Sequence, residues 1–211
     1  KLDWLQTRLD LGDAQLRKLV LVRPHLLGLS VEDNLAPKLD WLQTRLDLDD
    51  AGLRKMVLQI PAVLGCSIED NLAPTLEWLQ ARLGLDDVQL KKIVVTFPAL
   101  LGYSVEDNLA PTLEWLQRRL DLDDAGLRKT VLRPAVLSLS VEDNLAPKLD
   151  WLQDRLDLDA AQLKKMVLRL PAVLSYSVED NFSPRLDWLQ TRLGLDDAQL
   201  KKMVLKTPTL L

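Results

Sequence analysis

The chain has 211 residues, of which 47% are hydrophobic, and its formal net charge is −4 with a pI near 5.1. This hydrophobic content excludes a disordered chain, and the acidic balance provides no global basic signature for nucleic acid or for an anionic membrane. The single cysteine, Cys66, excludes an internal disulfide, and no apolar run approaches the ~20 residues that span a bilayer, so no membrane association is expected.

Tryptophans and prolines set the period of the sequence. Trp4, Trp41, Trp78, Trp115, Trp151 and Trp188 lie 37, 37, 37, 36 and 37 residues apart, and Leu-Gln follows each of them. All eleven prolines fall into two columns of the same period. Each unit of a repeat protein buries its face on its neighbours. We therefore expect residues 1–211 to form one elongated array of about five and a half units. Because the chain opens within a helix and stops before the next, we expect a fragment of a longer array.

The first element of a unit, exemplified by residues 86–97, is predicted to be a helix that we call helix A. Asp86 is a good N-cap, and Gln89 completes a capping box three residues later. Leu90, Ile93, Val94 and Phe97 recur at i, i+3, i+4 and i+7 and form one apolar face. Pro98 marks the end of this helix.

The next elements are a short turn and a second helix. Residues 99–101 are too few for an independent helix and suit one 3₁₀ turn. Ser104 is then a candidate N-cap of helix B, which we expect to run to about Leu120. Pro111 lies within the second turn of that helix, where it removes a backbone donor, so a kink or break is expected near Ala110. We expect the tryptophan column to belong to the core between units.

Candidate catalytic and metal-binding residues are few. Acidic residues lie mainly at helix starts, where stabilising the helix dipole explains them. Asp121, Asp123 and Asp124 lack the glycine and the closing glutamate of a calcium loop. His25 shares a column with alanines, and Cys66 is expected to be a packing residue. No phosphate loop, nucleophile elbow or catalytic histidine pattern is present. We therefore expect no enzyme, no metal and no cofactor.

Basic residues form two columns. The first is a dipeptide in helix A: Arg17-Lys18, Arg54-Lys55, Lys91-Lys92, Arg128-Lys129, Lys164-Lys165 and Lys201-Lys202. Its second member points away from the apolar face, so the column is either a solvated helix face or a phosphate-binding ridge. The other column comprises Arg8, Arg45, Arg82, Arg119, Arg155 and Arg192, each four residues after a tryptophan. These arginines either stack on their own tryptophan or pair with an aspartate of the next repeat, or else they contact a nucleic-acid backbone.

The order of these parts resembles a known family. Residues 163–195, LKKMVLRLPAVLSYSVEDNFSPRLDWLQTRLGL, are similar over their whole length to the repeat of mitochondrial transcription termination factors (mTERF). The resemblance implies a left-handed stack of triangular units that binds nucleic acid in mitochondria or plastids, in transcription, RNA processing or ribosome assembly. The chain departs from the family in being acidic and in having unusually uniform repeats.

The sequence therefore predicts an all-α helical-repeat solenoid, left-handed by the resemblance, with units of about 37 residues that contain two α-helices and a 3₁₀ turn. We expect a monomer that binds the backbone of double-stranded DNA or structured RNA through the helix A pairs, largely independently of sequence. Six stacked units would present these pairs over roughly 50–60 Å. The alternative function is a protein-binding or purely structural scaffold.

Overall fold

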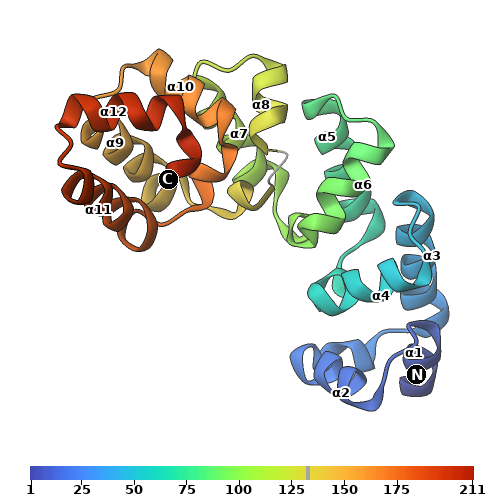
Figure 1. Ribbon diagram of the computed structural model, residues 1–211. Coiled ribbons are helices and arrows are strands. Elements are labelled where there is room, and N and C mark those ends of the chain that lie inside the picture. The colour runs from blue at the N-terminus through green and yellow to red at the C-terminus, as the bar shows by residue number, and fades with distance from the viewer. Residues whose placement is uncertain (132–133) are drawn as a thin grey trace. The chain divides into compact units, whose positions relative to one another are not determined.

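The computed structural model describes residues 1–131 and 134–211, which form two compact units, Lys1–Val105 and Glu106–Leu211. The described residues form helices joined by short connections and contain no strand, so the prediction of an all-α repeat fold is confirmed (Figure 1). Each full repeat contains helix A, a 3₁₀ turn, a π-helical turn and helix B.

The first unit contains α1 (Leu2–Arg8), α2 (Asp13–Val22), α3 (Ala36–Arg45), α4 (Asp50–Gln59), α5 (Ala73–Leu83) and α6 (Asp87–Thr96). The second contains α7 (Ala110–Arg119), α8 (Asp124–Val131), α9 (Ala146–Arg155), α10 (Ala160–Arg169), α11 (Ser183–Leu193) and α12 (Asp197–Lys206). Even-numbered helices are helix A of their repeats, and odd-numbered helices are helix B. The 3₁₀ turns are Pro24–Gly28, Pro61–Gly65, Pro98–Gly102, Pro134–Ser138, Pro171–Ser175 and Pro208–Leu210.

Helix A begins where the sequence predicts. The Asp86 carboxylate accepts a hydrogen bond from the Gln89 N–H at 2.7 Å, and the Gln89 side chain accepts one from the Asp86 N–H at 3.2 Å. These two bonds complete the expected capping box. Leu90, Ile93 and Val94 are buried on the apolar face of α6. The predicted 3₁₀ turn follows at Pro98–Gly102.

Helix B carries the predicted interruption near Ala110, in a specific form. A π-helical turn, Val105–Leu109, precedes α7, and Pro111 is the second residue of that α-helix. In the equivalent turn of the first repeat, the Leu35 N–H donates to the Ser30 carbonyl five residues earlier, at 3.1 Å. The extra residue in this turn separates the proline ring from the backbone that it would otherwise crowd.

The core lies between the leucine stripes of neighbouring helices. Leu109, Leu113 and Leu116 are each 0% exposed, as predicted for the main stripe of helix B. The expectation that the tryptophans belong to this core is only partly right. Five of the indoles are half-buried, and Trp188 is 63% exposed. The tryptophans therefore lie at the margin of the buried stripe.

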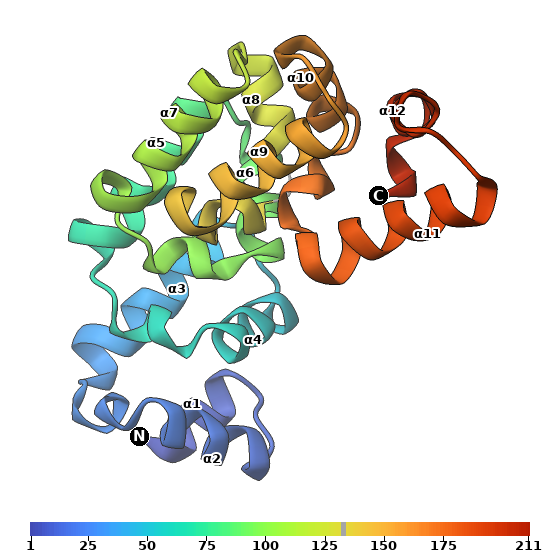
Figure 2. The same cartoon turned by 90° about the vertical axis from the view of Figure 1, so that its left-hand side faces the viewer.

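Consecutive helices A lie next to each other within the second unit. α8 and α10 contact each other and run side by side in both Figure 1 and Figure 2. This packing places the same column of helix A in adjacent positions, and it positions the candidate site described next.

Candidate nucleic-acid interface

The second members of the helix A pairs share one environment. Lys18, Lys55, Lys92, Lys129, Lys165 and Lys202 are all exposed. We call them the second-lysine column. Their exposure agrees with the wheel geometry predicted from the sequence. An ammonium group on a solvated helix face is free to contact a phosphate without first losing a protein partner.

The first members of the pairs have a different role, which sequence reasoning missed. Lys91 Nζ lies 3.0 Å from Asp47 Oδ2 in the preceding repeat, and Arg54 forms the same kind of pair with Asp10. Lys164 pairs with Asp121 at 3.1 Å, and Lys201 pairs with Asp157 at 3.2 Å. Each contact joins residues 43 or 44 positions apart, so it depends on the register between repeats.

These aspartates occupy a special backbone position. Asp10, Asp47, Asp121 and Asp157 follow helix B with φ of 45–46°, in the left-handed region. Gly84 and Gly194 occupy the same position with φ of 57° and 62°. A non-glycine residue is rarely found there, but aspartate tolerates the conformation best among charged residues. Of the remaining first members, Arg17 is exposed and Arg128 is half-buried.

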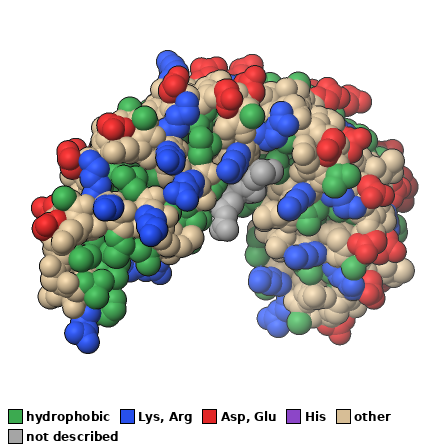
Figure 3. All heavy atoms as spheres, turned by 45° about the horizontal axis from the view of Figure 1, so that its top comes forward, with side chains coloured by type: hydrophobic (Ala, Val, Ile, Leu, Met, Phe, Trp, Pro, Cys, Tyr) green, Lys and Arg blue, Asp and Glu red, His purple; other side chains and the backbone are tan. Residues whose placement is uncertain are grey.

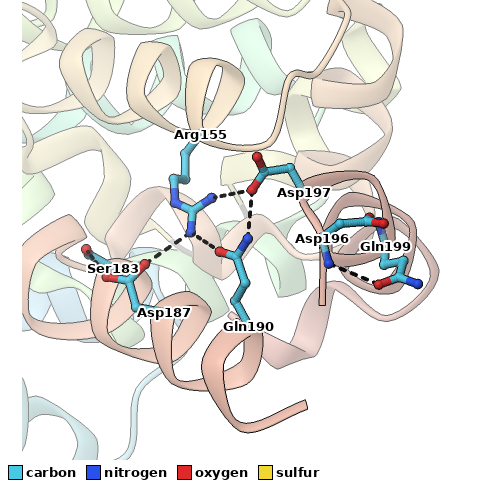
Figure 4. Close-up of polar contacts among 7 residues, drawn as sticks. All are labelled: Arg155, Ser183, Asp187, Gln190, Asp196, Asp197 and Gln199. Atoms are coloured by element: carbon cyan, nitrogen blue, oxygen red, sulfur yellow. Dashed lines mark hydrogen bonds and ion pairs between the residues drawn. The ribbon is translucent and has the colours of Figure 1, made fainter. Parts of the chain in front are cut away.

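The arginine column contacts the next repeat. Arg155 Nη2 donates to Asp187 at 3.1 Å and to Gln190 at 2.7 Å, and Arg155 Nη1 lies 3.6 Å from Asp197 (Figure 4). The Gln190 amide also donates to Asp197, at 2.8 Å. Equivalent contacts occur in other repeats: Arg8 contacts Asp40 and Gln43, Arg45 contacts Gln80 and Asp87, and Arg119 contacts Asp150 and Gln153. These arginines therefore join repeats, as one of the sequence interpretations predicts.

A third set of basic residues has no counterpart in the sequence analysis. Lys38 is 3% exposed, and its ammonium group donates to the Leu64 carbonyl at 2.6 Å and to Asn34 at 3.0 Å. Lys148 is 5% exposed and donates to the Leu174 carbonyl at 2.6 Å. Burial lowers the pKa of Lys38, an effect that Cys66 partly offsets, and burial also lowers the pKa of Lys148. Only the stacking of repeats brings these side chains to a carbonyl 26 residues away.

The most basic surface among the described hollows lies between α8 and α10. This α8–α10 groove has a volume of about 510 Å³ and is lined by Lys129, Lys164, Lys165 and Arg169, with Ala161 and Leu168. None of its described lining residues carries a carboxylate. Lys129 and Lys165, both exposed, belong to the second-lysine column. The groove therefore offers a local positive field to a polyanion, despite the acidic total.

A larger hollow of about 810 Å³ is less suited to an anion. Asp154, Asp157 and Asp197 line it together with Arg155, Lys201 and Lys202, so its charges balance, and the Lys201–Asp157 and Arg155–Asp197 pairs lie within it. Figure 3 shows how charged side chains are distributed on the face in view. In each unit, Lys and Arg side chains are interspersed with apolar ones, and Asp and Glu side chains gather toward the margin of that face.

The residues that the structure describes contain no group of three or more His, Cys, Asp or Glu side chains that could hold a metal ion. None of the described helices is long and apolar enough to cross a membrane. Burial raises the pKa of the Cys66 thiol, although Lys38 and Arg23 partly counteract this effect. A raised pKa disfavours the thiolate, which agrees with a packing role.

A family model described as mTERF matches residues 5–156. No curated protein shows a significant match to the chain.

Proposed function

Because the chain belongs to the mTERF family, we propose that it is a nucleic-acid-binding helical-repeat protein of organellar gene expression. In this proposal it binds the backbone of duplex DNA or structured RNA and catalyses no reaction. Its place of action is a mitochondrion or a plastid, and residues 1–211 act as one elongated array. Transcription termination or regulation and RNA or ribosome processing are the processes that such binding would serve.

One observation carries the proposal: the two basic residues of each helix A pair have different environments. The first members Arg54, Lys91, Lys164 and Lys201 are engaged by aspartates of the preceding repeat, whereas the second-lysine column is exposed throughout. The ion pairs neutralise part of the acidic surface beside the column. An acidic chain can therefore present a repeated cation to phosphates that are themselves repeated along a strand.

The α8–α10 groove is the place where we expect the strongest phosphate contact. Lys129 and Lys165 come from consecutive repeats, and Lys164 and Arg169 add charge from the same groove. Arg169 already donates to the Leu205 carbonyl at 3.0 Å, and Lys164 is paired with Asp121. Lys129 and Lys165 are thus the groove residues that we propose contact phosphate directly. Such contacts position a duplex but read no sequence.

Salt-dependent binding tests this function. Affinity for a duplex of about 25 base pairs, as DNA and as RNA, is measured by fluorescence anisotropy between about 50 and 200 mM salt. Engagement of the whole second-lysine column would give a log–log slope of about −5, from roughly 0.9 per phosphate. The double variant Lys129→Gln/Lys165→Gln should make that slope less negative by about 1.8, because two phosphate contacts are lost. Unrelated duplexes should bind about equally well.

A matched control separates the column from net charge. Arg118 and Lys206 are exposed cations outside the column, so Arg118→Gln/Lys206→Gln removes the same charge. The control should change the slope much less than Lys129→Gln/Lys165→Gln does. Equal effects would contradict a localised interface. Absence of duplex binding at about 50 mM salt would refute the proposed function and favour the protein-binding scaffold.

A further inference from the structure

The residue with a left-handed backbone that follows each helix B is of two kinds. We call residues 10, 47, 84, 121, 157 and 194 the left-handed position. Four repeats have an aspartate there, and each of these aspartates pairs with the first member of a helix A pair 43 or 44 residues later. Two repeats have a glycine, Gly84 and Gly194. A glycine has no side chain and therefore supplies no carboxylate.

The aspartates are not explained by the backbone alone. Glycine adopts the left-handed region without steric cost, whereas a residue with a Cβ atom does so at a cost in free energy. An aspartate at this position therefore indicates a role for its side chain, and the ion pair with helix A is the contact that the side chain makes.

Arg128 is a first member for which this carboxylate is replaced. The residue 44 positions before it is Gly84. In the described part of the chain, the Arg128 side chain forms no hydrogen bond or ion pair, and its Nε atom is buried without a partner. Arg128 directly precedes Lys129, which is exposed and lines the α8–α10 groove. Helix α8 thus carries two adjacent cations that no carboxylate of the described residues neutralises.

Lys164 lines the same groove but is neutralised. Its Nζ atom lies 3.1 Å from Asp121 Oδ2, and the two side chains are 33% and 99% exposed. A pair so open to solvent is weak, but its carboxylate still lowers the positive potential that would attract a phosphate. The Asp121 carbonyl also accepts a hydrogen bond from Nζ. Because this contact involves the backbone, a glycine at position 121 would keep it and remove only the negative charge.

We propose that the left-handed position is a switch, encoded in the sequence of each repeat, that sets how strongly the following helix A binds phosphate. Aspartate neutralises the first member of the pair, and glycine leaves it available. The inference rests on the proposed function and adds Arg128 to the residues that contact phosphate. It also predicts that the strength of backbone binding varies along the array, although the second-lysine column is the same in every repeat.

Asp121→Gly tests the switch within one unit. Glycine occupies the same position at Gly194 with a left-handed backbone, so the fold should be retained. In fluorescence anisotropy with the duplexes used above, affinity at about 100 mM salt should rise about two- to fivefold, the factor that corresponds to the loss of a strong exposed ion pair. The log–log salt slope should become more negative by about 0.9, because one more phosphate is engaged. Asp121→Asn removes the same charge, tolerates the left-handed region, and should act in the same direction.

Three further variants separate the switch from a change in net charge. Glu142→Gln removes one negative charge from an exposed side chain that forms no ion pair with helix A among the described residues, and it should change affinity much less. In a Lys164→Gln chain, Asp121→Gly should produce no gain, because the ammonium group that it would release is missing. Arg128→Gln should weaken binding by the unmodified chain more than Lys164→Gln does. Circular dichroism checks that every variant remains helical.

The outcomes distinguish this inference from the proposed function. If the unmodified chain binds duplex but Asp121→Gly and Asp121→Asn bind no more tightly, the switch is refuted and the function stands. A gain that persists without Lys164, or that Glu142→Gln equals, also refutes the switch. If Asp121→Gly binds at about 50 mM salt and the unmodified chain does not, the switch is supported and the unmodified chain is shown to be held inactive by its carboxylates. If neither chain binds, both the function and the switch are refuted.

Discussion

Two leucines in one column allow the interface between repeats to be weighed directly. Leu156 directly follows α9, and its equivalent Leu193 is the last residue of α11, but they are 2% and 57% exposed. Leu156→Ala removes three carbon atoms from a buried site, which costs about 2.4 kcal/mol in transfer free energy at about 0.8 kcal/mol each. The cavity left behind raises the total to roughly 2.5–5 kcal/mol. Leu193→Ala should cost about 1 kcal/mol, since much of this side chain remains in water and no closed cavity forms.

Urea unfolding followed by circular dichroism measures both costs. For a denaturant slope of about 2 kcal/mol/M, the unfolding midpoint should fall by at least about 1.2 M for Leu156→Ala and by about 0.5 M for Leu193→Ala. Equal decreases would refute the reasoning, because they would show that the next repeat does not bury this column.

Three further predictions concern single polar groups. Arg119→Gln should lower the free energy of unfolding by about 0.2–1 kcal/mol, because Arg119 and Asp150 form a partly exposed ion pair. This loss should be smaller at about 1 M salt, and global unfolding of the variant would contradict the prediction. Lys38→Thr should cost about 1–3 kcal/mol near neutral pH, because the Leu64 carbonyl loses a buried donor. The pKa of Lys38 is lowered in the folded state, so between that pKa and 10.5 the unfolded state binds more protons than the folded state does. As the pH rises toward 10.5, the free energy of unfolding of the unmodified chain should therefore increase relative to that of Lys38→Thr, as measured by urea titration at each pH. Cys66 should react with iodoacetamide at pH 8 more slowly than the same thiol in urea, since burial raises its pKa; equal rates would contradict this.

Local chemistry made much of the repeat predictable. Asp86 and Gln89 belong to a capping motif whose partners are three residues apart, and Pro98 ends a helix wherever the fold places it. The interruption at Ala110 was likewise predictable from Pro111. The π-helical form of this interruption was not predictable, because a kink, a break and an added residue can each relieve the clash between the proline ring and the preceding turn.

Contacts between repeats were harder to predict. The pairing of Lys91 with Asp47 spans 44 residues and requires the offset between neighbouring helices, which no local pattern encodes. A signal for the acceptor was nevertheless present, since aspartate alternates with glycine at the position that includes Gly84 and Gly194. That alternation indicates a left-handed residue. The burial of Lys38 had no such signal, because threonine and arginine share its column.

The π-helical turn also fixes the angle about the helix axis between the acidic segment that begins helix B and the tryptophan that follows it. One residue of an α-helix corresponds to a rotation of about 100°, so the added residue sets the azimuth of the Ser-Val-Glu-Asp segment relative to the tryptophan that follows. Val105 precedes Trp115 by the same interval as Val141 precedes Trp151, although the tryptophans themselves are 36 residues apart instead of 37. The missing residue therefore lies outside this segment. Deletion of one residue from the π turn would rotate the acidic segment about the helix axis by about 100° relative to that tryptophan.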